Sequence, residues 1–403
     1  MAIPGRNVDS LRRANLSSVL QLVHHSGGVS RAQLTTATGL TRSTVAVLVG
    51  ELVDLGLVVE REAPATNRVG RPSPLVVPSQ TPIVLAINPE LDAVTVGVVG
   101  LSARVHRRVR FELDEVLSAE RMVEVVSEIV GPLRDELESS HRIVGVGLAV
   151  PGLVRGDGVV RWAPHLDWHD VALTQLIGDA LGLPTAVGND ASLGALAERL
   201  FGVGRGVEDI VYLNGGASGI GGGVIAGGRS LGGASGYAGE FGQNRPGVLD
   251  AADQRTADGV LEDEVSRDRL MSALRSGPVD EERLERLLLM STSPTVRDEL
   301  ARQRRILAVA LGNAINVLNP SLVVLGGFLA TLHASDQEDL EARVDASSIT
   351  ATRSDARIVP AALGADRLMI GAAELALHPL LADPLGVEAI LAPETHRRAV
   401  TES

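Results

Sequence analysis

The chain has 403 residues, of which 45% are hydrophobic and 22% charged, and its formal net charge is −13. This length allows two or three compact units. No apolar run reaches the roughly 20 residues that span a bilayer, and the first ten residues lack the apolar core of an export signal, so we expect a cytoplasmic protein. The chain contains no cysteine and no lysine. Disulfides, thiolate catalysis, Schiff-base chemistry and a P-loop lysine are therefore excluded.

The negative charge is unevenly distributed along the chain. Residues 1–80 carry a balance of about +3, and the remainder carries about −16. An acidic body repels phosphate while a basic head attracts it, so only the head could face DNA. Uneven charge is also ordinary surface variation, and charge alone does not decide between these two interpretations.

The head has the pattern of three short helices. Apolar residues repeat at helical spacing from Leu16 to Val23. A second helix opens at Ser30, whose hydroxyl can cap it while Gln33 reaches back to the backbone. After a glycine turn, Thr41 caps a third helix with an inward apolar face and a polar first turn.

Two strand-like runs joined by an arginine-bearing loop follow the third helix, which completes the pattern of a winged helix-turn-helix. In such a domain the first turn of the third helix meets base edges, and the wing contacts phosphate or the minor groove. The side chains expected to contact DNA are Arg31, Gln33, Arg42, Ser43, Thr44, Arg68 and Arg71. The alternative is a small helical module for dimerisation or protein docking, because any three-helix bundle can imitate this geometry.

The rest of the chain predicts an α/β fold. Strand-like runs begin near residues 83, 93, 143, 209 and 321, and helical stretches cover 121–137 and 304–319. The region 215–242 is rich in glycine, where backbone could approach a ligand closely, although glycine-rich turns more often reflect tight packing.

Five motifs resemble the ROK family, which contains sugar kinases and sugar-responsive repressors. They are GVGLAVPG, WAPHLDW, NDASLGALAERLFG, SGIGGG with GGASGYAGEFG, and LGNAINVLNPSLVVLGG, in the family's order and at about its spacing. The helix-turn-helix with its GRPSPL wing is similar to that of the family's repressor branch. The resemblance implies a two-lobed actin/hexokinase-like body behind the winged helix-turn-helix.

The resemblance also implies a sugar site. Asn189 and Asp190 stand at the family's paired Asn-Asp, where the aspartate of the kinases deprotonates the sugar hydroxyl, and Glu240 and Glu262 match two sugar-binding glutamates. Gln243 stands at a family histidine position and could bond a sugar hydroxyl. The alternative for Asp190 is a helix cap, and both roles can hold together.

Two departures from the family argue against catalysis and against a metal. The kinases carry Asp-x-Gly-Gly-Thr on their first strand, whereas this chain has Pro89, which lacks an amide donor, and Glu90, which brings negative charge to a phosphate position. The family's zinc ligands are replaced by Gln243 and by residues near Asp253, Arg255 and Val260. We therefore predict no phosphoryl transfer, no metal and no cofactor.

These features predict a sugar-responsive transcriptional regulator, most simply a dimeric repressor with a sugar or sugar derivative as its effector. The expected layout is a DNA-binding head over 1–80, a first lobe over 81–197, a second lobe over 198–366, a helix over 367–380 that packs back on the first lobe, and a loose tail over 382–403. We expect the head to be a separate unit. The alternatives are an active sugar kinase with an accessory DNA head, and a regulator whose pocket is vestigial.

Overall fold

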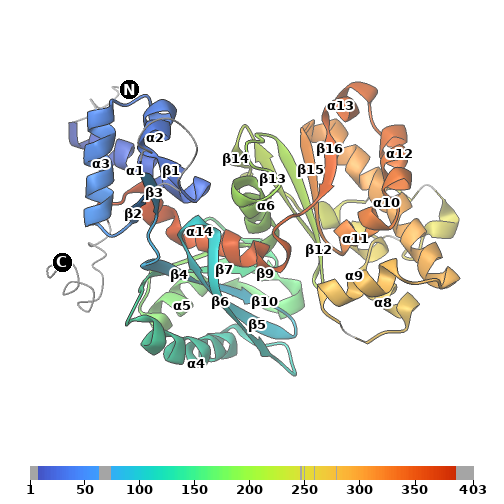
Figure 1. Cartoon of the computed structure of the whole chain (residues 1–403). Helices are drawn as coiled ribbons and strands as arrows, with labels where there is room; N and C mark the ends of the chain where they lie inside the picture. Colours follow the sequence, from blue (N-terminus) through green and yellow to red (C-terminus); the bar gives the residue numbers. More distant parts are fainter. Residues whose placement is uncertain are drawn as a thin grey trace.

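A computed structural model of the protein, drawn in Figure 1, describes residues 8–62, 74–245, 247–248, 250–257, 259–277 and 279–386. It confirms the predicted α/β class, with a winged-helix head at one end and two α/β lobes behind it. Within these ranges, no helix is long and apolar enough to cross a membrane.

The head consists of three helices and a small antiparallel sheet in the order β1-β3-β2. Its elements are α1 (Val8–Ser26), β1 (Val29–Ser30), α2 (Arg31–Thr38), α3 (Arg42–Asp54), β2 (Val58–Arg61) and β3 (Leu75–Pro78). Ser30 and Gln33 form the predicted capping box on α2, and Thr41 Oγ1 accepts the amide of Thr44 to cap α3. The apolar face predicted between Leu16 and Val23 is fully buried.

The first lobe contains a five-stranded sheet in the order β11-β7-β4-β5-β6 and a three-stranded sheet in the order β10-β9-β8. Its elements are β4 (Pro82–Pro89), β5 (Ala93–Gly100), η1 (Leu101–Ala103), β6 (Arg104–Glu112), α4 (Ala119–Leu137), β7 (Arg142–Val150), β8 (Leu153–Val154), β9 (Val160–Ala163), η2 (Pro164–Leu166), β10 (Trp168–Val171), α5 (Leu173–Leu181) and β11 (Thr185–Asn189). Strands β4 and β5 are buried along their whole length, because α4 and α5 cover one face of the sheet and α14 the other.

The second lobe has a sheet in the order β14-β13-β12-β15-β16 with most of its helices on the side away from the head (Figure 1). Its strands are β12 (Ile210–Gly216), β13 (Gly219–Ala226), β14 (Arg229–Ser230), β15 (Leu322–Gly327) and β16 (Arg357–Pro360). Its helices are η3 (Phe241–Gln243), η4 (Ala251–Asp253), α7 (Leu261–Glu264), α8 (Arg267–Leu274), α9 (Glu281–Leu289), α10 (Pro294–Leu318), α11 (Phe328–Ser335), α12 (Gln337–Ser347), α13 (Thr350–Asp355) and η5 (Gly364–Asp366).

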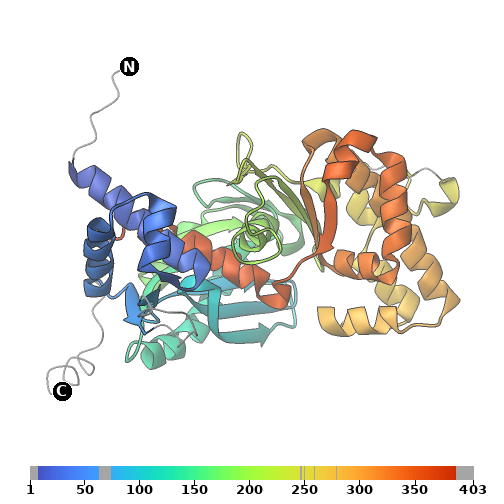
Figure 2. The ribbon, with the colours of Figure 1, turned by 45° about the horizontal axis from the view of Figure 1, so that its top comes forward.

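Two helices join the three parts of the molecule. Helix α6 (Asp190–Phe201) lies against β12 and β13 of the second lobe and against α14. Helix α14 (Arg367–Ala382) leaves the second lobe, crosses the sheet of the first lobe and reaches the head, as Figures 1 and 2 show. The lobe boundary expected between residues 197 and 198 thus falls inside α6.

The head is not separated from the body, in contrast to our expectation. One continuous cluster of buried apolar residues includes Leu16 and Leu20 of α1 together with Leu377 and Leu381 of α14. The reason is that α1 turns apolar residues toward α14 as well as toward α2 and α3. In the region expected to be a loose tail, Ala382 still belongs to α14, and residues 387–403 lie outside the described ranges.

Candidate DNA interface and effector site

The first turn of α3 presents the polar side chains that the sequence assigned to DNA. Arg42 and Ser43 are exposed and Thr44 is half-buried. The hydroxyls of Ser43 and Thr44 lie 2.9 and 2.8 Å from that of Thr41 at the helix cap. The guanidinium of Arg42 is consequently the group of this turn with the longest reach toward a base edge.

Two of the other expected DNA contacts have intramolecular partners. The guanidinium of Arg31 donates to both carboxylate oxygens of Glu60, at 2.7 and 2.6 Å, and so ties α2 to the wing strand β2. The side-chain oxygen of Gln33 accepts the amide of Ser30 at 2.9 Å. Both side chains thereby stabilise the head. Arg68 and Arg71 lie outside the described residues.

The sequence analysis missed one exposed apolar residue on α3. Val47 is 66% exposed, and it lies one turn after Ser43, on the same face of the helix. Gly50 follows at the next turn, and a β-carbon there would meet no atom within 4 Å. Neither packing nor a positive φ requires that glycine. The spacing of Ser43 and Val47 was visible in the sequence and could have indicated a contact face.

The N-terminus of α6 holds the first two of the predicted effector residues. Asn189 is the helix cap, because its side-chain oxygen accepts the amide of Ser192 at 2.8 Å while its amide nitrogen donates to the carbonyl of Gly152 at 3.0 Å. Asp190 is the first helical residue, and its Oδ1 accepts the amide of Ala191 at 2.7 Å. The capping role considered for Asp190 therefore belongs to Asn189, whose side chain serves the scaffold.

The structure brings the other predicted effector residues together on the second lobe. Glu262, in α7, accepts the amide of Ile220 at 3.1 Å and the side-chain amide of Gln243 at 2.6 Å. A β-carbon on Gly219, at φ +106°, or on Gly242 would lie only 2.4 or 2.6 Å from the Glu262 carboxylate. Both glycines therefore leave room for that side chain.

The carboxylates of the two lobes interact electrostatically. Burial raises the pKa of Asp190 above its ordinary value, although the positive charge of Arg367 opposes the change. Desolvation, followed by the negative charges of Asp190 and Glu262, raises the pKa of Glu240. Because Asp190 and Glu262 both act on Glu240, the three carboxylates form an acidic cluster whose oxygens could accept hydroxyl hydrogens.

The turn between β4 and β5, where the related kinases hold phosphate, is closed by an internal network. Glu90 accepts hydrogen bonds from Asn88 at 2.9 Å, Thr95 at 3.3 Å and Arg110 at 2.5 Å. Arg110 also pairs with Asp92 at 3.1 Å. A carboxylate thus stands at this turn, and the nearby guanidinium is already paired with it.

The residues at the family's zinc positions do not fit a zinc ion. Gln243 donates its amide to Glu262, and both oxygens of Asp253 accept from Arg305 at 2.7 and 2.6 Å. Arg255 and Val260 offer no ligand atom that zinc prefers. The absence of a metal remains a prediction.

A buried polar cluster joins the head to the body. The backbone amide of Ser102 donates to His24 Nδ1 at 3.0 Å, so Nε2 carries the ring proton and donates it to Glu374 at 2.7 Å. His24, His25 and Glu374 place their ligand atoms within 4.8 Å of one another, as a cation would require. The protonated Nε2 of His24 makes this cluster a hydrogen-bonded junction between α1 and α14 in place of a metal site.

Comparison with known proteins agrees with this arrangement. Residues 86–378 match the model of the ROK family, and residues 17–68 match that of the MarR family. Because the first match covers more than half of the chain, the protein belongs to the ROK family.

Two relatives carry names of repressors. A xylose repressor of Caldicellulosiruptor bescii is 24% identical, with 93% of this chain and 98% of the relative aligned. An N-acetylglucosamine repressor of Escherichia coli O157:H7 is 23% identical, with 93% and 95% aligned.

Two solved structures share the fold. A ROK family transcriptional regulator, described as a homologue of the E. coli MLC protein, is 24% identical with a TM-score of 0.73, and 94% of this chain and 99% of that chain are covered. A ROK glucokinase from Streptomyces griseus is 22% identical with a TM-score of 0.61, and 73% of this chain and 99% of that chain are covered.

Proposed function

We propose that the protein is a sugar-responsive transcriptional repressor without kinase activity. It binds operator DNA through α3 and the wing, and it binds a sugar or sugar derivative through the Asp190, Glu240 and Glu262 carboxylates. The observation that carries the proposal is the joining of a winged-helix head to a ROK body whose phosphate turn is closed by Glu90 and Arg110. The names of the aligned relatives, repressors of xylose and N-acetylglucosamine systems, support the same role.

The contacts of Glu90 support the loss of phosphoryl transfer. Transfer depends on positioned amide donors and metal-bound phosphate. The Glu90 carboxylate would repel a phosphate at this turn, and Arg110 is held by Glu90 and Asp92. Asp190, which resembles the base of the kinases, would then serve as a hydrogen-bond acceptor for a sugar hydroxyl.

Helix α6 gives the proposed effector a direct route to the head. Asp190 lies at its first residue, and Phe201 at its last residue packs edge-on against the rings of His24 and His25 on α1, with centroids 5.4 and 5.9 Å apart. Glu198, fully buried, accepts the amides of Ala362 and Leu363 in the segment that leads to α14. A lobe movement that shifts α6 would therefore also act on α1 of the head and on α14.

A dimer is part of the proposal because operators recognised by such heads are usually two-fold, and one head contacts too few phosphates for tight binding. The effector can change operator affinity only by its differential affinity for two lobe arrangements. Those arrangements would set the distance between the two heads on DNA.

The test begins with the purified full chain. Operator sequences are selected from random DNA, the affinity is then titrated with a panel including xylose and N-acetylglucosamine, and the same panel is incubated with ATP and magnesium. The proposal expects a selected DNA site, at least one sugar that changes the affinity for that site, and no sugar phosphate. Sugar-dependent ATP turnover would instead favour a kinase with an accessory head. Sequence-specific DNA binding without any sugar effect would favour a vestigial pocket.

A further inference from the structure

The acidic side chain proposed to bind the effector from the second lobe is carried by a segment with little regular structure. The described residues between 253 and 266 contain only the end of η4 and the single turn of α7. A four-residue helix is too short to be stable alone, so the segment depends on contacts with its surroundings. The position of Glu262 must therefore be set by what the segment packs against.

Helix α10 holds this segment through one buried guanidinium. Arg302 is 2% exposed, and it donates to the carboxylate of Glu264 at 2.9 Å, to the carbonyl of Glu264 at 2.6 Å and to the carbonyl of Asp253 at 2.8 Å. Its remaining donors form a two-pronged contact with Glu299 on the same helix, at 2.9 and 2.8 Å. One side chain thus connects both ends of the segment to α10.

The partners of Arg302 are themselves satisfied within the segment. The carboxylate of Glu264, which is fully buried, also accepts the backbone amides of Arg255 and Thr256 at 2.9 and 2.7 Å. These amides and Arg302 hold the pKa of Glu264 below its ordinary value, although burial opposes them. A buried ion pair with all its hydrogen bonds made fixes geometry more strongly than an apolar contact does.

Neighbours on α10 complete the attachment. Gln303 is fully buried, accepts the amide of Ser266 at 3.2 Å and donates to its carbonyl at 3.0 Å. From Glu264 the chain leads back by two residues to Glu262. The amide of Leu261 donates to the carbonyl of Asn244 at 2.8 Å, which ties α7 to the η3 turn that carries Gln243.

We propose that Arg302 is the positioning residue of the effector site: it holds residues 253–266 on α10 and thereby sets where the carboxylate of Glu262 lies. The inference rests on the proposed function in that Glu262 is taken to contact the effector. It requires no metal, and it gives one guanidinium a contact near each end of the segment.

The test compares Arg302→Met with Arg304→Met, a matched control. Arg304 lies on the same helix and is 7% exposed, but its partners are Ser335 and Asp339 on the other side, at 2.7 and 3.2 Å. Hydrogen exchange of the full chain, followed by mass spectrometry, is measured for residues 253–266. We expect exchange there to be at least about tenfold faster in Arg302→Met, because the substitution removes hydrogen bonds to a charged group that protect these amides. In Arg304→Met the exchange should be unchanged.

A second measurement is the sugar concentration that half-maximally changes operator binding. It should rise by about tenfold or more in Arg302→Met and stay within about twofold in Arg304→Met. If Arg302→Met fails to fold, Glu264→Gln keeps the shape of the pair while removing its charge and should give the same pattern more weakly. The proposal is overturned if residues 253–266 exchange at the wild-type rate in the Arg302 or Glu264 variant. It is also overturned if exchange is accelerated equally in both arginine variants. If no sugar acts on the wild type, the proposed function fails, while the exchange comparison still decides the role of Arg302.

Discussion

At the scale of single residues, side-chain caps begin helices α2 and α3 of the head and α6 of the effector site, and a buried ion pair joins α7 to α10. The capping box of Ser30 and Gln33 and the cap of Thr41 follow from side chains three residues apart, and the structure confirms them. That Asn189, and not Asp190, caps α6 was not predictable, because asparagine and aspartate favour that position about equally. The pairing of Arg302 with Glu264 spans 38 residues and had no local signal.

Val47 gives a prediction at this scale about base recognition. Its exposed methyl groups lie one turn after Ser43, on the face of α3 expected in the major groove, where an apolar side chain can contact the 5-methyl group of thymine. Val47→Ala should weaken binding to a selected operator by about 1 kcal/mol, roughly fivefold.

The measurement is an operator titration in which thymines are replaced one at a time by deoxyuridine, which lacks only the methyl group. One replacement should weaken wild type and leave Val47→Ala unaffected. Val53→Ala, a truncation near the end of the same helix where the side chain is 39% exposed, is the control. If every deoxyuridine operator binds wild type as tightly as its parent does, Val47 does not read a thymine.

At the scale of elements, periodicity and turn signals identified the helices of the head and five strands of the two body sheets, but not which lobes each helix contacts. The strands expected near residues 83, 93, 143, 209 and 321 all form. No sequence pattern indicated that α6 contacts both lobes, because a helix with two buried faces has the same pattern whichever neighbours cover it. For this reason the lobe boundary that we predicted between residues 197 and 198 falls inside α6.

The contact of α6 with the head predicts that a change at Phe201 alters the response to sugar. Phe201→Ala removes the ring that packs on His24 and His25, and it should reduce the coupling between sugar and operator by about 0.5 to 2 kcal/mol. The coupling is measured as the ratio of operator affinities with and without sugar. Leu196→Ala, a truncation about one turn earlier in α6, should leave that ratio close to wild type. Equal ratios for Phe201→Ala and wild type would exclude this route.

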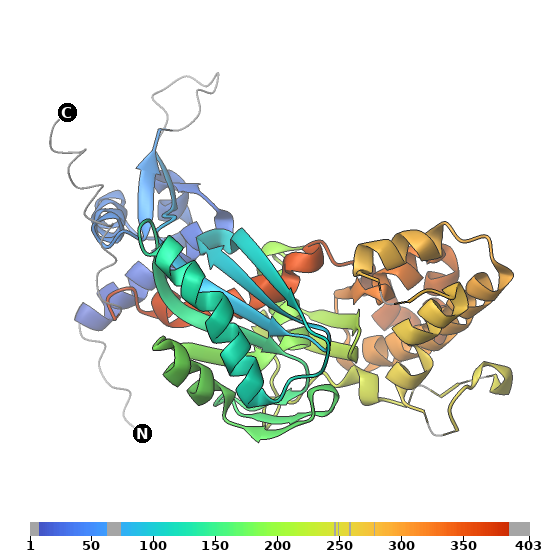
Figure 3. The same ribbon diagram turned by 90° about the horizontal axis from the view of Figure 1, so that it is seen from below.

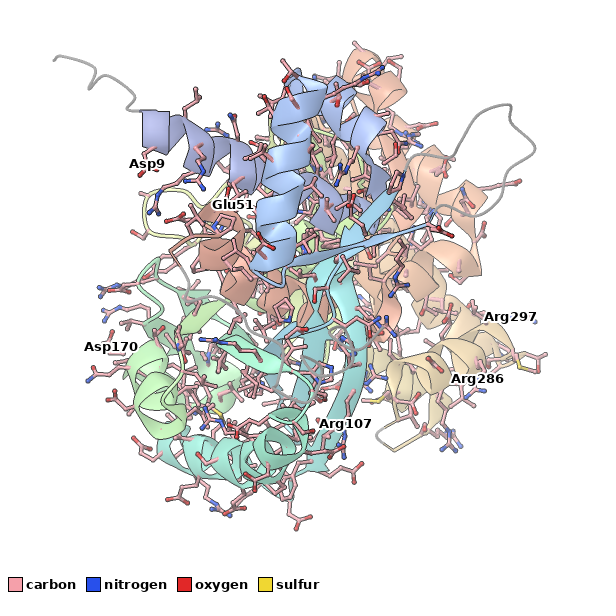
Figure 4. The ribbon with its side chains drawn as sticks, turned by 60° about the vertical axis from the view of Figure 1, so that its left-hand side comes forward. Asp9, Glu51, Arg107, Asp170, Arg286 and Arg297 are labelled. Atoms are coloured by element: carbon pink, nitrogen blue, oxygen red, sulfur yellow. The ribbon has the colours of Figure 1, made fainter. Side chains whose placement is uncertain are left out.

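At the scale of the whole molecule, the head and the second lobe lie at opposite ends with the first lobe and α14 between them (Figure 3). Figure 4 views the molecule from the head, with α3 and its Glu51 in front of the body. Glu51 is paired with Arg12 of α1 at 2.6 Å. Helix α3 is thus paired with α1, the helix that packs on α14. The head, which we expected to be a separate unit, shares one cluster of buried apolar residues with the body.

The junction between head and body predicts a dependence of stability on pH. Desolvation, and then the charges of His24, Arg199 and Arg205, lower the pKa of His25 to about 4, with Glu374 opposing them. Because this pKa lies below the unfolded value of about 6.5, the unfolded chain binds more protons between these limits. The stability contributed by neutral His25 is present above pH 6.5 and is lost as the pH falls toward 4.

Urea denaturation at pH 7 and at pH 5 measures this effect. With the shift discounted for the one-third exposure of His25, wild type should lose about 1 to 2 kcal/mol more than His25→Asn over that interval. His106 and His141 are present in both proteins, so their contributions cancel in the difference. Equal losses would show that this histidine does not titrate abnormally at the junction.

The most direct test of the account is an operator titration of wild type, Asp190→Ala and Glu240→Ala, each with and without the sugar that acts on wild type. Coupling between two sites is typically worth 5- to 150-fold in affinity. The account predicts a ratio in that range for wild type and a ratio near one for both variants, because weakened effector contacts must weaken the shift in operator binding. If both variants respond to the sugar as wild type does, the effector does not bind at this carboxylate cluster, and the account is contradicted.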